Sequence, residues 1–229
     1  MSTISLLEAV LKSGGPTAVR FDGGRPFPNR LAVLPSAFNP PTVAHLALLE
    51  VARSLPGAGA ACALLTTRNV DKGLTGAAFA DRVGMLLAVN EAHHWLGVVA
   101  TNQARIIDQE AALAVAFPGV EFDFVVGYDT LVRLFDPRYY SAMDDELAPF
   151  FERARVIALN RGEAGTAAVR AFVEREADHF AERIVVAELD AHPASLSSTL
   201  ARAAFREGSS TTAVPPAVAR YIEEHQLYR

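Results

Sequence analysis

The sequence predicts an α/β protein built on a mostly parallel, five- or six-stranded sheet with helices on both faces. Short apolar runs rich in Val, Leu and Ile recur along the chain, and stretches with helical spacing lie between them. This alternation favours parallel strands joined by crossover helices. In such sheets ligands bind beyond the carboxyl ends of the strands, so the functional residues are expected to follow the strands.

The expected elements follow this alternation in order. The strands are expected at 31–34, 60–66, 96–100, 122–127, 156–159 and 184–189. The helices between them are expected at 43–54, 77–92, 103–117, 130–134 and 166–180. Residues 1–29 suggest a short helix (4–11) and a Gly/Pro-rich connector, and residues 30–229 suggest one domain. Its C-terminal helical part, about 193–229, is expected to hold helices at 199–205 and 216–225, and the polar, aromatic segment 136–151 is expected to form a flap.

Composition limits the classes of function. The chain has 229 residues, of which 51% are hydrophobic, and a formal net charge of -5, so a broad basic surface for nucleic acid is not expected. Cys62 is the one cysteine and lies in an apolar run, which excludes an intrachain disulfide and favours a core position. The sequence has neither a secretory signal pattern nor an apolar stretch of membrane-spanning length. We therefore expect a cytoplasmic protein without a membrane partner; the sequence does not decide the oligomeric state.

The stretch from Ser36 to His45, SAFNPPTVAH, joins the first expected strand to the first long helix. Backbone N–H groups and the positive end of the helix dipole make such a turn a site for phosphate. Thr42 can cap the helix or donate to phosphate, and His45 lies on the same helix face. The alternative is an ordinary turn with a packed histidine.

A second phosphate-binding pattern opens a C-terminal helix at Ser198 and Thr199, with Arg202 one turn further on. The hydroxyls, the free N–H groups and the guanidinium suit a triphosphate. The alternative is simple N-capping with a surface arginine.

The carboxyl end of another expected strand carries Gly127 and Asp129, where a carboxylate can accept from ribose hydroxyls. Lys72 and Arg161 follow two further strands. Each feature alone has an ordinary interpretation as a helix cap or a solvated surface charge. Together they are expected at one edge of the sheet, which favours a nucleotide site.

In combination these residues resemble the nucleotidyltransferase superfamily with the T/H-x-G-H signature, and more closely its nicotinamide/nicotinate mononucleotide adenylyltransferases. The family's G-S-F-N-P-P-T-x-x-H segment matches 36–45, G-x-D matches 127–129 and I-S-S-T-x-x-R matches 196–202. The family's ending, Y-I-x-x-x-x-L-Y, matches 221–228. The similarity therefore runs from about residue 31 to 228 and implies a Rossmann-like nucleotidyltransferase fold.

The resemblance implies in-line attack by the phosphate of a mononucleotide on the α-phosphorus of ATP, with pyrophosphate released. The implied acceptor is NMN or nicotinate mononucleotide, and Mg²⁺ would be carried by the ATP phosphates rather than by protein ligands. The residues implied in catalysis are His45, Thr42, Lys72 and Arg202. The residues implied in nucleotide binding are Ser36, Ala37, Phe38, Asn39, Gly127, Asp129, Tyr140, Arg161, Ser198 and Thr199.

The chain departs from the family pattern at three places. Ser36 and Ala44 stand where the family has glycine. Of the two aromatic positions that sandwich the pyridine ring in the eukaryotic-type enzymes, one corresponds to Thr101 and the other to Tyr140. Two alternatives therefore stay open: the same fold acting on another phosphorylated acceptor, on CTP or with water, and a nucleotide-binding module without turnover. The blocks at 69–72 and 135–140 also resemble a divergent branch of the family that includes a fungal protein credited with ATP hydrolysis.

Overall fold

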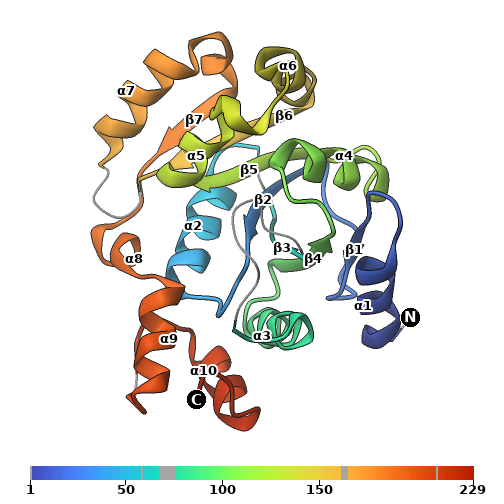
Figure 1. Cartoon of the computed structure of the whole chain (residues 1–229), viewed down its shortest axis with the longest axis vertical. Coiled ribbons are helices and arrows are strands. Elements are labelled where there is room, and N and C mark those ends of the chain that lie inside the picture. Colours follow the sequence, from blue (N-terminus) through green and yellow to red (C-terminus); the bar gives the residue numbers. More distant parts are fainter. Residues whose placement is uncertain (1, 58, 68–75, 161–164, 210) are drawn as a thin grey trace.

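The computed structural model describes residues 2–57, 59–67, 76–160, 165–209 and 211–229. Over these residues the chain forms one seven-stranded sheet in the order β1-β4-β3-β2-β5-β6-β7 (Figure 1). The strands are β1 (Ala18–Arg20), β2 (Arg30–Ser36), β3 (Ala61–Thr66), β4 (Leu96–Thr101), β5 (Glu121–Gly127), β6 (Ala154–Leu159) and β7 (Ile184–Ala187). The helices are α1 (Thr3–Lys12), α2 (Val43–Ser54), α3 (Phe79–Ala92), α4 (Ile106–Ala116), α5 (Tyr128–Leu134), α6 (Met143–Arg153), α7 (Thr166–Glu176), α8 (Ala191–Ser195), α9 (Ser198–Arg206) and α10 (Pro216–Glu224).

The sheet is parallel from β2 to β7, which confirms the predicted α/β class. The sheet has one strand more than the largest number predicted, because β1 pairs antiparallel with β4 at the sheet edge. β1 has three residues and lies in the Gly/Pro-rich connector, too short for a periodic signal.

Two apolar layers cover the sheet, as the alternation of its side chains requires. Ala63 and Leu65 of β3 pack in the core shared with α2, α3 and the C-terminal helices. Cys62 and Leu64 face the core shared with α4, α5, α6 and α7. Cys62 is fully buried, as predicted, and burial raises the pKa of its thiol, so it is an inert core residue.

The sheet opens where the strand order reverses, between β2 and β5. Their ladder ends at the pair Val33–Phe124, although β2 continues to Ser36 and β5 to Gly127. Beyond that pair β2 stays in register with β3, and β5 with β6. The divergence of β2 and β5 marks the topological switch point of the sheet, the crevice position at which open α/β sheets bind ligands.

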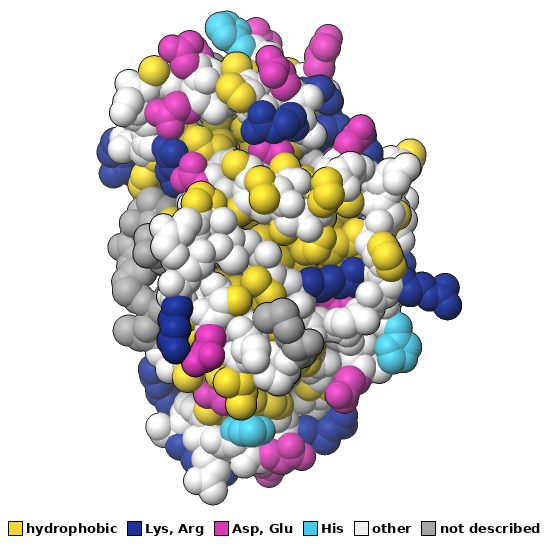
Figure 2. Space-filling view, turned by 90° about the vertical axis from the view of Figure 1, so that its right-hand side faces the viewer, with side chains coloured by type: hydrophobic (Ala, Val, Ile, Leu, Met, Phe, Trp, Pro, Cys, Tyr) yellow, Lys and Arg dark blue, Asp and Glu magenta, His cyan; other side chains and the backbone are white. Residues whose placement is uncertain are grey.

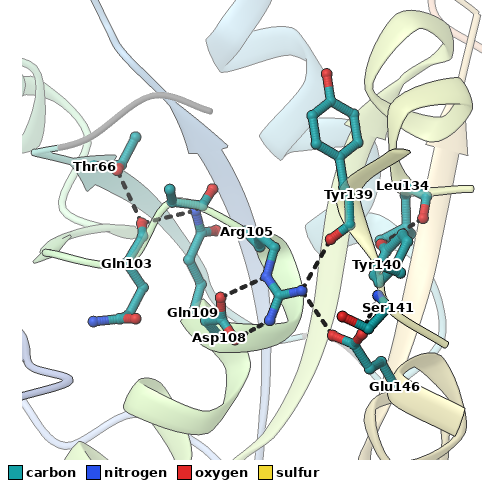
Figure 3. Close-up of polar contacts among 11 residues, drawn as sticks. Thr66, Gln103, Arg105, Asp108, Gln109, Leu134, Tyr139, Tyr140, Ser141 and Glu146 are labelled. Atoms are coloured by element: carbon teal, nitrogen blue, oxygen red, sulfur yellow. Dashed lines mark hydrogen bonds and ion pairs between the residues drawn. The ribbon is translucent and has the colours of Figure 1, made fainter. Parts of the chain in front are cut away.

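The expected flap at 136–151 is wrong. This segment forms a short 3-10 helix, η1 (Pro137–Tyr139), followed by most of the eleven-residue helix α6. Leu147, Phe150 and Phe151 of α6 are buried and share one helix face, which the polar residues between them concealed in the sequence. Arg105 fastens the segment to the start of α4, because its guanidinium donates to Glu146 and to the Tyr139 carbonyl (Figure 3).

Figure 2 shows acidic and basic side chains interspersed on one face of the molecule, without a continuous basic field among the coloured side chains. No helix within the described ranges is long and apolar enough to cross a bilayer. In the same part of the chain, no three His, Cys, Asp or Glu side chains gather as ligands for a metal ion.

Candidate active site

The turn from β2 to α2 fixes the ring of His45. Thr42 is the N-cap of α2, and the two residues form a reciprocal capping box. The Thr42 amide donates to His45 Nδ1 at 3.0 Å, and the Thr42 hydroxyl lies 2.8 Å from the same nitrogen. Because an amide only donates, Nδ1 is the unprotonated nitrogen, and the proton of the neutral ring is on Nε2.

His45 Nε2 lies toward the carboxyl end of β2, where the Ser36 hydroxyl is 3.1 Å away. The serine that replaces the family's glycine therefore contacts the histidine directly. The ring of Phe38 packs 4.9 Å from the imidazole and is almost fully buried, so Phe38 supports His45 from within the core. Phe38 also has a left-handed backbone (φ 45), a strained geometry that the surrounding turn maintains.

Helix α9 is fastened to the same turn. The Ser198 hydroxyl donates to the Pro40 carbonyl at 2.9 Å, and Arg202 Nη1 donates to the Asn39 carbonyl at 2.6 Å. Arg202 Nη2 also lies 3.2 Å from the Thr199 hydroxyl. The structure thus brings together the two patterns that are predicted to bind phosphate and that the sequence separates by more than 150 positions.

Two further residues border this turn and were missed by the sequence prediction. Arg82 of α3 donates from Nη1 to the Ala37 carbonyl at 3.2 Å, and its side chain is almost fully buried. Tyr228 donates its hydroxyl to Asn39 Oδ1 at 2.6 Å. Burial raises the pKa of Tyr228 and lowers that of Arg82. Tyr228 had a signal in the family's C-terminal pattern, whereas Arg82 had none.

Gly127 and Asp129 lie on the opposite side of the crevice. Gly127 ends β5 and is the N-cap of α5, and Asp129 is an exposed carboxylate in the first turn of that helix. Asp129 is therefore not itself the helix cap. The predicted Lys72 and Arg161 lie outside the described residues.

A small pocket lies between the start of α4, α5 and η1. Arg105, Arg133, Thr130 and Tyr140 are among the residues that line it. Tyr140 donates its hydroxyl to the Leu134 carbonyl at 2.6 Å, which holds the half-buried ring against the pocket, and burial raises its pKa to about 12 (Figure 3). Arg105 is neutralised by Asp108 and Glu146, whose carboxylates raise the pKa of its guanidinium above its usual range.

Thr101, the other position compared with the family's stacking residues, is fully buried at the end of β4. Its hydroxyl donates to the Thr17 carbonyl and accepts from the Gln103 amide. Asn102 also bonds to Thr17 and to the Gly15 carbonyl. The N-terminal connector thus engages the Thr101 hydroxyl, and Tyr140 is the one aromatic side chain at the two positions compared with the family's stacking residues.

Comparisons with known proteins show the family of this chain. No family model matches the sequence. A curated protein of Synechococcus sp. (strain JA-3-3Ab), provisionally named nicotinate-nucleotide adenylyltransferase, is 30% identical over 224 residues, which are 89% of this chain and 96% of the relative. The chain belongs to the nicotinamide/nicotinate mononucleotide adenylyltransferase family. A Schizosaccharomyces pombe protein, provisionally named nicotinamide mononucleotide adenylyltransferase, is 28% identical over 86% of this chain and 85% of its own length.

The fold of the family is also found among solved structures. The nicotinic acid mononucleotide adenylyltransferase of Plasmodium falciparum, complexed with NaAD, superposes with a TM-score of 0.66 at 15% identity and covers 87% of this chain and 97% of its own. These findings confirm the Rossmann-like nucleotidyltransferase fold and the nucleotidyltransferase class of the family. The roles of individual residues in this chain stay predictions.

Proposed function

We propose that this protein transfers the adenylyl group of ATP to the phosphate of a pyridine mononucleotide, NMN or nicotinate mononucleotide, and releases pyrophosphate. The observation that supports this most is the fixed His45 ring at the crevice between β2 and β5. Because Nδ1 accepts from the Thr42 amide, Nε2 supplies an N–H donor toward the end of β2, where a phosphate would lie.

The reaction forms a bond between an acceptor phosphate oxygen and the α-phosphorus of ATP and breaks the bond from that phosphorus to the bridging oxygen of the leaving pyrophosphate. The acceptor phosphate is already anionic near neutral pH, so no strong base is needed. Catalysis then rests on positioning and on donors that meet the developing charge. His45 would donate to the α-phosphate, and Ser198, Thr199 and Arg202 would hold the β- and γ-phosphates. Lys72 would meet a phosphate of one of the two substrates.

The remaining predicted residues complete the proposed ATP site. Thr42 would keep the His45 ring in place, while Gly127 and Asp129 would meet ribose. The predicted set also holds the turn residues Ser36, Ala37, Phe38 and Asn39, together with Arg161. We assign catalysis to residues 30–229, with 1–29 attached through β1.

Mg²⁺ fits this site as an ion carried by the ATP phosphates. Magnesium prefers oxygen ligands and retains several waters, and Asp129 is the one carboxylate among the residues predicted for the site. The ion would offset the charge of the departing pyrophosphate.

The acceptor would lie in the pocket beside Tyr140. Adenylyl transfer to another phosphorylated acceptor is the second candidate, and the closure of Thr101 by the N-terminal connector favours it. A pyridine ring would stack on one side chain here instead of two, which leaves room for acceptors of other shapes.

The direct test incubates the protein with ATP, Mg²⁺ and either NMN or nicotinate mononucleotide and measures both dinucleotide and pyrophosphate. Equal amounts of the two products are expected. Release of phosphate or AMP without dinucleotide would instead indicate ATP hydrolysis. ATP binding in calorimetry without turnover on any acceptor would indicate a nucleotide-binding module.

Replacing Tyr140 with alanine is expected to raise the KM for the mononucleotide about 5-fold and to leave the KM for ATP within about 2-fold, because stacking on one ring contributes about 1 kcal/mol. Tyr140→Phe is the matched control, because it retains the ring and loses only the hydroxyl bond to the Leu134 carbonyl. Its KM for the mononucleotide should lie between those of wild type and Tyr140→Ala. Steady-state kinetics with each substrate varied in turn measure both values. An unchanged acceptor KM in Tyr140→Ala would place the acceptor elsewhere.

A further inference from the structure

Buried charged side chains in the described part of the chain are balanced, with one exception. Asp123 is fully buried and pairs with both Arg30 and Arg155. Glu110 is 1% exposed and pairs with Arg153. Arg82 is 3% exposed, and no carboxylate of the described residues lies within ion-pair distance of its guanidinium.

The hydrogen bonds of Arg82 do not compensate for this burial. Nη1 donates to the Ala37 carbonyl at 3.2 Å, while Nε is buried without a partner. Asp81, its neighbour in sequence, lies beside Tyr221 of α10, and burial together with this carboxylate raises the pKa of the Tyr221 hydroxyl. An unpaired buried cation is unfavourable in a folded protein and is retained where an anion balances it.

The position of Arg82 indicates which anion balances its charge. Ala37 follows Ser36, whose hydroxyl contacts His45, so the guanidinium lies against the turn proposed to hold phosphate. Arg202 bonds to the same turn at the Asn39 carbonyl. The positive charges of both arginines lie near Tyr228 and oppose the rise that burial causes in its pKa. The Tyr228 hydroxyl in turn donates to the Asn39 side chain. Two positive charges therefore border the turn, one from α3 and one from α9.

We propose that Arg82 is a positioning residue of the polyphosphate site. Its guanidinium donates to the Ala37 carbonyl and so holds the turn, and its positive charge attracts the bound polyphosphate. The polyphosphate is then the anion that balances Arg82, since no described carboxylate pairs with it. Little water screens a charge this deeply buried, so its effect on a nearby phosphate exceeds that of a surface arginine. This inference rests on the proposed function and adds a residue from α3 to that site.

The test separates the charge of Arg82 from its hydrogen bond. Arg82→Lys and Arg82→Gln both retain a donor, but only lysine retains the charge. Affinity for inorganic pyrophosphate and for ATP with Mg²⁺ is measured by calorimetry without an acceptor, and the unfolding midpoint is measured without ligand. The matched control is Arg53→Gln. Arg53 also has a buried, unpartnered Nε, but it lies in the last turn of α2, with its guanidinium carbon 4.6 Å from the centroid of the Trp95 ring.

Arg82→Lys is expected to bind pyrophosphate within about 3-fold of wild type, and Arg82→Gln about 10-fold or more weakly. Without ligand, the unfolding midpoint of Arg82→Gln should equal or exceed that of Arg82→Lys, because the glutamine variant removes an unbalanced buried charge. Arg53→Gln should bind as wild type does. Equal pyrophosphate affinity of Arg82→Lys and Arg82→Gln would overturn the inference and leave the proposed function intact, whereas a wild-type protein that binds neither pyrophosphate nor ATP would overturn both.

Discussion

Replacing His45 with alanine is expected to lower kcat for adenylyl transfer about 10²–10³-fold, while the Kd for ATP rises by no more than about 5-fold. The ring is held by Thr42 at Nδ1, so Nε2–H is a donor already aimed at the end of β2 before substrate binds. A donor fixed in this way is worth most where charge develops in the transition state and less in the ground state. Single-turnover kinetics and ATP calorimetry measure the two effects separately.

Three controls accompany this variant. Removal of the capping box costs about 1 kcal/mol of stability, so the unfolding midpoint verifies that His45→Ala is folded at the assay temperature. His94→Ala changes an exposed histidine outside the site and should be fully active. His45→Gln supplies a neutral N–H donor and should recover part of kcat. Full activity of His45→Ala in a folded protein would remove His45 from the mechanism.

The part of the site that the sequence predicts best is the part that is local in the chain. Ser36, Thr42 and His45 come from one strand, one turn and one helix start, so their spacing alone indicates that they meet. The parallel topology then brings Gly127 to the same edge, because carboxyl ends of parallel strands lie together. The contact of Arg202 with this turn can be predicted only from the family resemblance, because 163 positions separate the two bonded residues.

The residues that the sequence fails to predict depend on distant packing. Arg82 lies in an ordinary helical sequence, and its burial follows from the C-terminal helices that pack against α3. Thr101 is engaged in the structure by the N-terminal connector, and this bond joins residues more than 80 positions apart in the sequence. Helix α6 was missed because a polar composition hid three buried apolar residues. In each case the deciding interaction is tertiary, and local propensity and periodicity do not contain it.

Replacing Arg202 with alanine is expected to lower kcat/KM for ATP about 100-fold, because hydrogen bonds to charged groups contribute about 1.5–3 kcal/mol each. Without substrate, its guanidinium bonds to the Asn39 carbonyl and the Thr199 hydroxyl, and it is placed to donate to a polyphosphate held by the start of α9. The loss should appear in both KM and kcat, since the β- and γ-phosphates are bound in the ground state and leave in the transition state.

Arg206 offers a matched control on the same helix. It lies one turn further along α9 and is exposed, so Arg206→Ala removes an equal charge from the same helix and should leave kcat/KM for ATP within about 2-fold. Arg202→Lys keeps the charge but loses the planar fork that bonds to Asn39 and Thr199 together, and an intermediate kcat/KM is expected. Equal losses in Arg202→Ala and Arg206→Ala would indicate that α9 acts through its overall positive charge, and the assignment of the polyphosphate to Arg202 would then be wrong.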